Sequence, residues 1–334
     1  MWFKTPRPRL ATVCKHALRA AAHQPSFAIC FEGMILSVFA PFLLATFGLG
    51  AAVPPATPDA RAITALSNTN IASFLPYTRF AAVAYCPPSL TLPWSCGPHC
   101  KTNPSFIPIA AGGDGNKIQF WYVGFSPPSG EIIVSHQGTN FTKLDPVVRD
   151  INILFEGLNS ALFPGVPTSI QIHSGFAESQ KRTAGNVLQA VQTGITKFNA
   201  KKVTITGHSL GAAVGLLDAM FLRLNISEDV AVRFIGYALP RVGNQAFADF
   251  VDSSGVQVEY INNKKDLVPI LPGRFLGYRH PSGEIHIQGS GTWMSCPGQD
   301  NPSIQCTTGD VTTVFHSNLN NHNGPYQGIE MGRC

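Results

Sequence analysis

Gly207-His208-Ser209-Leu210-Gly211 is the stretch of this 334-residue chain that decides its fold. It follows residues 202–206, in which apolar and threonine side chains alternate as in a β-strand, and it precedes the apolar run 212–224. A serine between two glycines at such a strand-to-helix turn is typical of a nucleophile elbow, which lifts the hydroxyl clear of the sheet. The alternative is that Ser209 only caps a helix, although a cap requires neither glycine.

An activated serine needs an acid and a histidine, and in this topology both follow the serine along the chain. Asp218, Asp249 and Asp252 all lie within stretches that read as helices. Asp266 instead follows the strand-like run 256–261 and lies in a loop at a strand's carboxyl end, where doubly wound sheets place their sites. We expect Asp266 to be the acid. The alternative is a solvated turn aspartate beside two lysines.

Four histidines follow Asp266 in the sequence, namely His280, His286, His316 and His322. The first two flank the turn of an expected hairpin, where a histidine is more often a surface or core residue than a base. His322 precedes Asn-Gly-Pro-Tyr, a turn that can hold an imidazole at a fixed angle. We expect His322 to be the base, with His316 as the alternative.

The tetrahedral intermediate of an acyl transfer carries a negative oxygen that needs fixed hydrogen-bond donors. The N–H of Leu210, directly after the serine, is one expected donor. The strand-like run 131–135 is followed by a loop in which Gly138 permits a close backbone approach and Thr139 offers both an N–H and a hydroxyl. Thr139 is the second expected donor. The alternative is a polar loop that does not touch the substrate.

Together these residues resemble the fungal class 3 lipases, the α/β-hydrolase group that also contains fungal feruloyl esterases. The resemblance covers most of residues 60–334 and implies that Ser209, Asp266 and His322 form a catalytic triad, with Thr139 in the oxyanion hole. The matching blocks, in order, are Pro76-Tyr77-Thr78, Ala84-Tyr85-Cys86, Gly138-Thr139, Ile172-His173-Ser174-Gly175-Phe176, Thr206 to Gly211, Leu239-Pro240-Arg241-Val242-Gly243-Asn244, Asp266-Leu267-Val268-Pro269 and His322-Asn323-Gly324-Pro325-Tyr326.

The order of expected elements agrees with an α/β-hydrolase fold in one domain. A helical, disulfide-pinned first part precedes alternating strands and helices, a pattern typical of a central, mostly parallel sheet flanked by helices. The expected strands lie near 117–125, 130–136, 168–173, 202–206, 230–238 and 256–262, the helices near 175–199, 210–224 and 244–252, and a last hairpin near 277–288.

Composition indicates an enzyme with a large core and a lightly charged surface, because 44% of the residues are hydrophobic and only 13% are charged. The formal net charge of +5 arises mostly from residues 1–50, which hold five basic residues and one acidic residue. The rest of the chain has 19 basic and 18 acidic residues, a net charge of +1 that does not suggest nucleic acid as a partner. No glycine-rich phosphate loop, zinc-type spacing or internal repeat is present in the sequence, so we expect no cofactor and no metal.

The first 51 residues read as a leader, followed by a Pro/Ala linker at 52–60 and the hydrolase domain at 61–334. Residues 35–48 form an apolar run of signal-peptide length, with small residues for cleavage after it, and the run is short for a membrane span. The basic stretch 1–33 is long for a signal peptide. A start at Met34, a mitochondrial-type presequence and a signal anchor therefore remain as alternatives. We expect a secreted, extracellular protein with no transmembrane anchor in its mature form.

Cysteine usage agrees with secretion, because removal of the leader leaves six cysteines, an even number. The sequence also holds two possible N-glycosylation sites, at Asn140 and Asn225. The resemblance favours a disulfide between Cys86 and Cys334 and another between Cys96 and Cys100, which leaves Cys296 with Cys306. A metal site is the alternative, and the spacings fit it poorly.

The expected substrate follows from residues 141–150, which stand where lipases of the family carry a short lid. The apolar side chains of Phe141, Leu144, Val147 and Val148 fit one helical face that would open at an oil surface, whereas Pro146 favours an ordinary loop. We expect a monomeric serine hydrolase that cleaves triacylglycerols through an acyl-enzyme at a lipid–water interface. The alternatives are a feruloyl-type esterase with a fixed polar flap, or a catalytically silent lipid-binding relative.

Overall fold

The computed structural model describes residues 62–139 and 154–334. The expected leader and linker, the possible lid at 141–150 and the first sequon residue, Asn140, lie outside the described residues.

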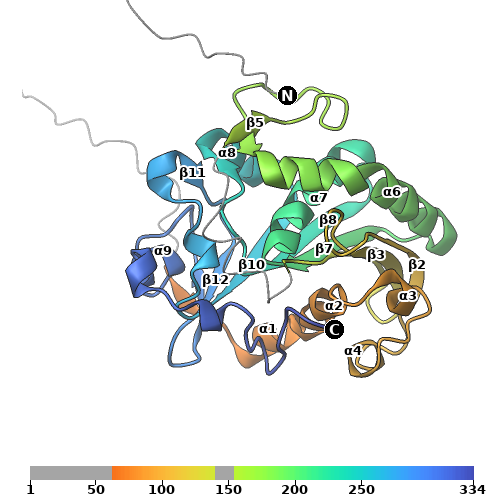
Figure 1. The fold of residues 1–334 in the computed structure, drawn as a ribbon, viewed down its shortest axis with the longest axis horizontal. Coiled ribbons are helices and arrows are strands. Elements are labelled where there is room, and N and C mark those ends of the chain that lie inside the picture. Colours follow the sequence, from red (N-terminus) through yellow and green to blue (C-terminus); the bar gives the residue numbers. More distant parts are fainter. Residues whose placement is uncertain (1–61, 140–153) are drawn as a thin grey trace, which may run out of the picture. The chain divides into compact units, whose positions relative to one another are not determined.

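A nine-stranded sheet forms the centre of the hydrolase domain, in the order β1-β13-β12-β10-β8-β7-β4-β3-β2 (Figure 1). Its five middle strands, from β12 to β4, are parallel to one another. At each edge two further strands are added, and each of them pairs antiparallel with its neighbour. This arrangement confirms the predicted mostly parallel sheet. The strands are β1 (Thr64–Ala65), β2 (Ile107–Gly112), β3 (Trp121–Ser126), β4 (Glu131–His136), β7 (Lys202–His208), β8 (Ala231–Tyr237), β10 (Gln257–Asn263), β12 (Glu284–Ile287) and β13 (Trp293–Cys296).

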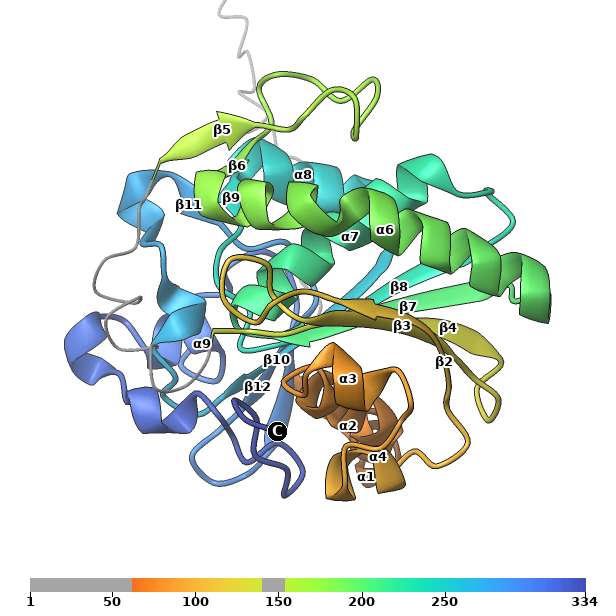
Figure 2. The ribbon, with the colours of Figure 1, turned by 45° about the vertical axis from the view of Figure 1, so that its right-hand side comes forward.

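Helices cover both faces of the sheet (Figure 2). On one face lie α6 (Ser174–Phe198), α7 (Leu210–Asn225) and α8 (Gln245–Ser253). On the other lie α1 (Asn68–Ser73), α2 (Leu75–Val83), α3 (Pro88–Thr91) and α4 (Pro98–Lys101). None of the helices in the described part of the chain combines the length and the hydropathy needed to cross a membrane.

The two apolar layers follow from the period of the strands, because successive side chains of a strand point to opposite faces. In β4, Ile132 and Val134 belong to the buried cluster under α6 and α7, while Ile133 belongs to the cluster under α2. Burial on both faces explains why apolar side chains can stand at successive positions of a middle strand, as they do at residues 132–134 of β4. The same burial extends to α7, in which residues 211–222 are all buried, and Gly215 lets the helix approach the sheet: a Cβ there would lie 3.2 Å from Ile205 Cγ2.

A second, four-stranded sheet corrects two of the sequence predictions. It runs β11 (Tyr278–Arg279), β9 (Gly243–Asn244), β6 (Gln171–His173), β5 (Phe155–Gly157), with antiparallel pairing. The strand predicted near 168–173 is therefore β6 of this sheet rather than a strand of the central one. The hairpin predicted near 277–288 is wrong, because β11 pairs with β9 whereas β12 runs parallel to β10. Strands of two to four residues carry too few side chains for their period to show which sheet they join.

Three disulfides staple the domain, and they are the pairings described above. Cys86–Cys334 attaches the segment after α2 to the C-terminus, and Cys96–Cys100 joins the turn before α4 to that helix. Cys296–Cys306 joins the end of β13 to the residue before α9 (Thr307–Asp310). Because all six sulfurs are oxidised in pairs, none is a thiolate available to a metal ion.

Candidate active site

Ser209 lies alone between β7, which ends at His208, and α7, which begins at Leu210. Its backbone has φ 60° and ψ −128°, a conformation that non-glycine residues rarely adopt and that is found mainly at functional sites. The Ser209 N–H donates to the Tyr237 carbonyl of the neighbouring strand at 2.9 Å, which holds the strained residue in place. The predicted elbow is thus present at the carboxyl end of the sheet.

The two elbow glycines are required by close contacts. A Cβ on Gly207 would lie 2.3 Å from the carbonyl oxygen of Gly211, and a Cβ on Gly211 would lie 2.2 Å from the carbonyl oxygen of His136. Contacts this short are forbidden, so the strand and the helix can meet at this angle only if both positions lack side chains. The second contact also shows that the end of β4 packs directly on the start of α7.

The loop after β4 lies against the serine. A Cβ on Gly138 would lie 2.4 Å from the His208 carbonyl oxygen and 3.1 Å from Ser209 Cβ. The loop is anchored by Gln137, whose side-chain oxygen accepts from Phe120 N at 2.9 Å and whose N–H donates to the Phe120 carbonyl at 2.8 Å. Thr139 follows Gly138 and is half-buried. Sequence reasoning did not assign a role to Gln137.

Leu210 follows the serine directly, as the first residue of α7. The first N–H groups of a helix have no acceptor within the helix, so they can serve an anion. Thr139 and Leu210 are thus each one residue from a group at the elbow: Thr139 follows Gly138, which lies against Ser209, and Leu210 follows Ser209 itself.

Asp266 and His322 are brought together although they are 56 residues apart. His322 Nδ1 lies 2.9 Å from Asp266 Oδ2, and both side chains are only 1% exposed. The other carboxylate oxygen of Asp266 accepts from Val268 N at 3.0 Å, which fixes the carboxylate after β10. Asn263, the last residue of β10, donates to the carbonyls of Asn321 and Gly324 and so ties the histidine loop to the sheet.

The second ring nitrogen of His322, Nε2, is not used by the contact with Asp266. Nε2 is buried and has no hydrogen-bond partner among the described residues. The ring stands next to the elbow, with its centroid 4.5 Å from that of His208, the residue before Ser209. A histidine whose Nδ1–H is held by a carboxylate carries its free electron pair on Nε2, as a base requires.

His208 and Tyr85 connect these parts and were missed as site residues. His208 Nε2 lies 2.9 Å from the His322 carbonyl and must donate to it, so Nδ1 accepts from the Tyr85 hydroxyl at 2.6 Å. Burial, with His322 nearby, lowers the pKa of His208 well below its usual range, so the ring is neutral. Burial also raises the pKa of Tyr85, and the backbone of Gly138 opposes that shift. The sequence signals were the Ala84-Tyr85-Cys86 block for Tyr85 and the Thr206 to Gly211 block for His208.

The alternative histidines lie elsewhere. His316 is exposed, on the short 3-10 helix η4 (Val314–His316), and its Nδ1 contacts the hydroxyls of Thr312 and Thr313. His280 Nε2 donates to the Pro269 carbonyl, and His286 contacts two backbone carbonyls. In the described part of the chain, none of the three forms a hydrogen bond with Asp266.

The remaining aspartates and the second sequon residue also have other partners. Asp249 and Asp252 are exposed on α8, and Asp218 is bound to His136 in the core. Asn225 uses its side-chain nitrogen to donate to the carbonyls of Leu162 and Phe221, at 3.0 and 2.7 Å. A glycan on that nitrogen would replace one of these hydrogens.

Residues 133–276 match the family described as lipase (class 3). The chain is 32% identical over 229 residues to a secreted mono- and diacylglycerol lipase of Malassezia globosa, covering 66% of this chain and 73% of the relative. It is 34% identical over 217 residues to a second such lipase of that organism, covering 63% and 69%. The chain belongs to the class 3 lipase family. It is a carboxylic ester hydrolase.

The fold of this class 3 lipase is similar to solved structures as well. A triacylglyceride lipase of Rhizomucor miehei is 25% identical, with a TM-score of 0.70, over 81% of this chain and 99% of that one. The Lip2 lipase of Yarrowia lipolytica is 24% identical, with a TM-score of 0.69, over 82% and 98%. These likenesses confirm the predicted α/β-hydrolase architecture.

A buried ion pair supports the segment that follows Asp266 in this lipase. Arg241 and Asp300 are each 3% exposed and lie 2.7 Å apart. Arg241 also donates to the carbonyls of Ile270 and Pro272, and the second carboxylate oxygen of Asp300 accepts from His280 N at 3.0 Å. Burial would raise the pKa of Asp300, but His280 and Arg241 outweigh it and hold that pKa at about 2.

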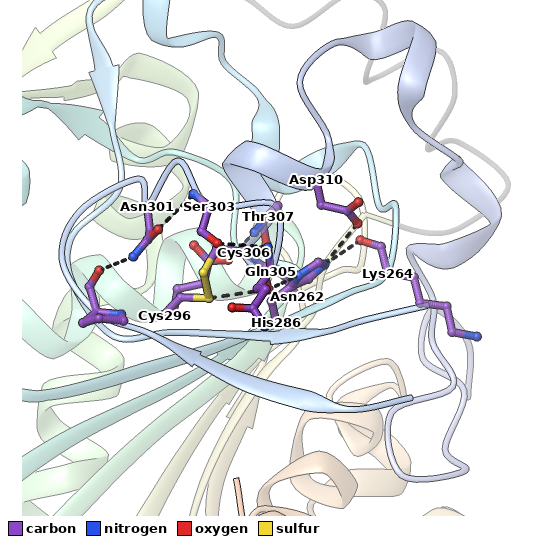
Figure 3. Close-up of a disulfide and its surroundings, with 12 residues drawn as sticks. Asn262, Lys264, His286, Cys296, Asn301, Ser303, Gln305, Cys306, Thr307 and Asp310 are labelled. Atoms are coloured by element: carbon purple, nitrogen blue, oxygen red, sulfur yellow. Dashed lines mark hydrogen bonds and ion pairs between the residues drawn. A yellow bond between two sulfur atoms is a disulfide. The ribbon is translucent and has the colours of Figure 1, made fainter. Parts of the chain in front are cut away.

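The disulfide Cys296–Cys306 closes the loop that presents Asp300, and Figure 3 shows its surroundings. Asn262, near the end of β10, donates to the hydroxyl of Thr307 at 3.0 Å. His286 reaches the Gln305 carbonyl on one side and the Lys264 carbonyl on the other, each at 3.0 Å. The loop is thus fastened to the same strand end that carries Asp266.

Proposed function

We propose that this lipase cleaves acylglycerol esters through an acyl-enzyme formed on Ser209, with His322 as base and Asp266 as the group that orients it. The observation that carries the proposal is the arrangement of His322. Its Nδ1 is held by a buried carboxylate, and its buried Nε2 has no partner among the described residues. Its ring lies against that of His208, the residue before the strained serine. Such an arrangement activates a hydroxyl that is otherwise a weak nucleophile.

The first half of the reaction transfers the acyl group. The Ser209 proton moves to His322 Nε2 while Oγ bonds to the ester carbonyl carbon, and the carbonyl oxygen becomes negative. The N–H groups of Thr139 and Leu210 stabilise that oxygen. The bond to the alcohol then breaks, and the alcohol leaves with the proton from Nε2.

Water completes the cycle. It gives a proton to His322 Nε2 as its oxygen attacks the acyl carbon, and the carboxylic acid leaves as Ser209 recovers its proton. Asp266 stays ionised and stabilises the imidazolium in both halves. Neutral His208 adds no competing charge beside the base.

Two exposed phenylalanines support a lipid surface as the place of action. Phe275 is 89% exposed on the 3-10 helix η3 (Arg274–Leu276), and Phe315 is 93% exposed on η4. The first lies nine residues after Asp266 and the second seven before His322. Large apolar side chains held in water mark surfaces that bind something apolar. No described residue specifically favours a feruloyl-type substrate.

Secretion and substrate range are part of the proposal. The Malassezia relatives are named secreted, and three disulfides agree with an oxidising compartment. Those relatives are named for mono- and diacylglycerols, whereas the Rhizomucor miehei structure is named for triacylglycerides. We propose that the mature chain acts outside the cell as a monomer, with acylglycerols as its substrates.

Side-by-side rates test the proposal. The secreted protein is assayed on monoolein, diolein, emulsified tributyrin, methyl ferulate and nitrophenyl esters from C2 to C16, with Ser209→Ala as control. We expect acylglycerols to be cleaved fastest, with a rate that rises abruptly once tributyrin exceeds its solubility. Ser209→Ala should be folded and inactive. Faster cleavage of methyl ferulate, with a smooth rate through the solubility limit, would replace the lipase assignment with the esterase one.

A further inference from the structure

A second buried histidine–aspartate pair lies beneath the site and takes no part in the proposed reaction. His136 Nε2 lies 2.7 Å from Asp218 Oδ2, with side chains 1% and 0% exposed. The other oxygen of Asp218 accepts from Gln180 Nε2 at 2.8 Å, and Gln180 is 1% exposed. The three polar side chains come from β4, α7 and α6 and stand in the apolar layer between the sheet and these helices.

The position of His136 ties it to one side of the proposed oxyanion hole. It is the last residue of β4, three residues before Thr139, and it lies opposite Gly207 in the parallel pairing with β7. Its carbonyl oxygen is also the atom that a Cβ on Gly211 would strike. A shift of His136 would therefore move both the loop that holds Thr139 and its contact with the elbow.

Asp218 is tied to the other side of the proposed oxyanion hole, where Leu210 lies. It lies on α7, eight residues after Leu210, and a helix transmits the position of one turn to the next because its hydrogen bonds are continuous. The pair thus joins the two elements that supply the two donors. Gln180 adds the long helix α6 as a third support.

A gain in folding stability does not by itself explain why a buried polar network stands in the core. Replacing a buried charged or polar pair by apolar residues of similar volume is often neutral or stabilising, whereas removing one partner is strongly destabilising. Fixed geometry is what a satisfied network of this kind can add. Oxyanion donors need that geometry, because they act only if they already point at the oxygen when its charge develops.

We propose that His136, Asp218 and Gln180 are positioning residues that set the separation of the two oxyanion donors, Thr139 and Leu210. The proposal rests on the function proposed above. The three side chains are buried and do not touch substrate. They act through the backbone of β4 and α7.

The test compares single and double apolar variants on soluble nitrophenyl butyrate. In Asp218→Leu, His136 is left buried without its partner, so both kcat and the unfolding temperature should fall. In His136→Leu/Asp218→Leu, the unfolding temperature should return close to that of the parent while kcat stays at least about tenfold lower, with KM unchanged. A boronic acid that mimics the tetrahedral intermediate should bind more weakly by about the same factor.

Two further variants keep the outcome decisive. His136→Gln retains a donor for Asp218 and should lose less than about threefold in kcat. If the double variant does not fold, Gln180→Met, which removes one hydrogen bond, takes its place, and a drop in kcat at constant KM is again expected. The control is Arg233→Leu/Glu259→Leu, which removes a partly exposed pair between β8 and β10 and should leave kcat unchanged.

The outcomes separate the two proposals. If the double variant recovers parental kcat together with parental stability, or if kcat falls only in proportion to the folded fraction, the positioning role is wrong while the proposed chemistry stands. If Ser209→Ala retains activity, the proposed chemistry is wrong, whatever the double variant does.

Discussion

The two buried histidine–aspartate pairs of this molecule are almost alike in separation and burial, yet they present different ring nitrogens to their carboxylates. Asp266 lies 2.9 Å from Nδ1 of His322, whereas Asp218 lies 2.7 Å from Nε2 of His136. In the first pair Nε2, at the far end of the ring, remains unpaired among the described residues, beside the elbow. In the second pair Nε2 is engaged within the core. Distance and burial therefore do not identify a base, and the nitrogen that remains available does.

Removing each histidine tests this difference with the largest expected effect. His322→Ala should lower kcat by about 10⁴- to 10⁶-fold, the range seen when a triad histidine is removed from a serine hydrolase. His136→Ala should lower it by far less, and the exposed His316→Ala should have little effect. The measurement is kcat on nitrophenyl butyrate, with circular dichroism to verify folding. Equal losses for His322→Ala and His316→Ala would contradict the comparison.

The two aspartates should differ in the same direction. Asp266→Asn should lower kcat by about 10⁴-fold, because the imidazole would favour the wrong tautomer, as in the serine protease triad. Asp218→Asn should cost only about tenfold, since it removes an acceptor for Gln180 and leaves the base intact. Steady-state kinetics of the two variants at matched folded fractions check this. A larger loss in Asp218→Asn would mean that the catalytic pair has been misassigned.

The sequence predicted the first pair and not the second for a physical reason. Ser209, Asp266 and His322 each stand in a local pattern, a strand end or a turn, that can be read from their neighbours. His136 and Asp218 are 82 residues apart, in a buried strand and a buried helix, and nothing near either residue indicates its partner. The same limit applies to Tyr85 and His208, which meet only because α2 packs beneath the elbow.

The strands likewise divide into those that the sequence predicts and those that it does not. Strands β4 and β7 of the central sheet were predictable because they are six and seven residues long and carry buried β-branched side chains. The second sheet was not, because β9 and β11 have two residues each and are fixed by tertiary pairing. The lid interpretation for residues 141–150 stays a prediction.

A third buried histidine sharpens the comparison through pH. Neither ring nitrogen of His280 has a carboxylate partner among the described residues: Nε2 donates to the Pro269 carbonyl, and Nδ1 has no partner there. Burial lowers its pKa to about 4, with Asp300 opposing and Arg241 adding to the shift. The unfolded chain therefore binds the proton more readily, so stability should fall as pH drops from about 6.5 to about 4, by roughly 3 kcal/mol at most.

Chemical denaturation of the parent and of His280→Gln at several pH values measures this slope. The variant should show a flatter dependence between pH 6.5 and 4. If the free energy of unfolding of the parent instead increases as the pH drops from 6.5 to 4, His280 is charged in the folded protein.

Covalent labelling of the serine tests the central claim most directly. The protein is treated with a nitrophenyl phosphonate ester, and the modified residue is located and timed by peptide mass spectrometry in the parent, His322→Ala and His136→Leu/Asp218→Leu. The account predicts one label per chain, on Ser209, formed orders of magnitude more slowly in His322→Ala and only moderately more slowly in the double variant. A label on another residue, or an unchanged rate in His322→Ala, would contradict it.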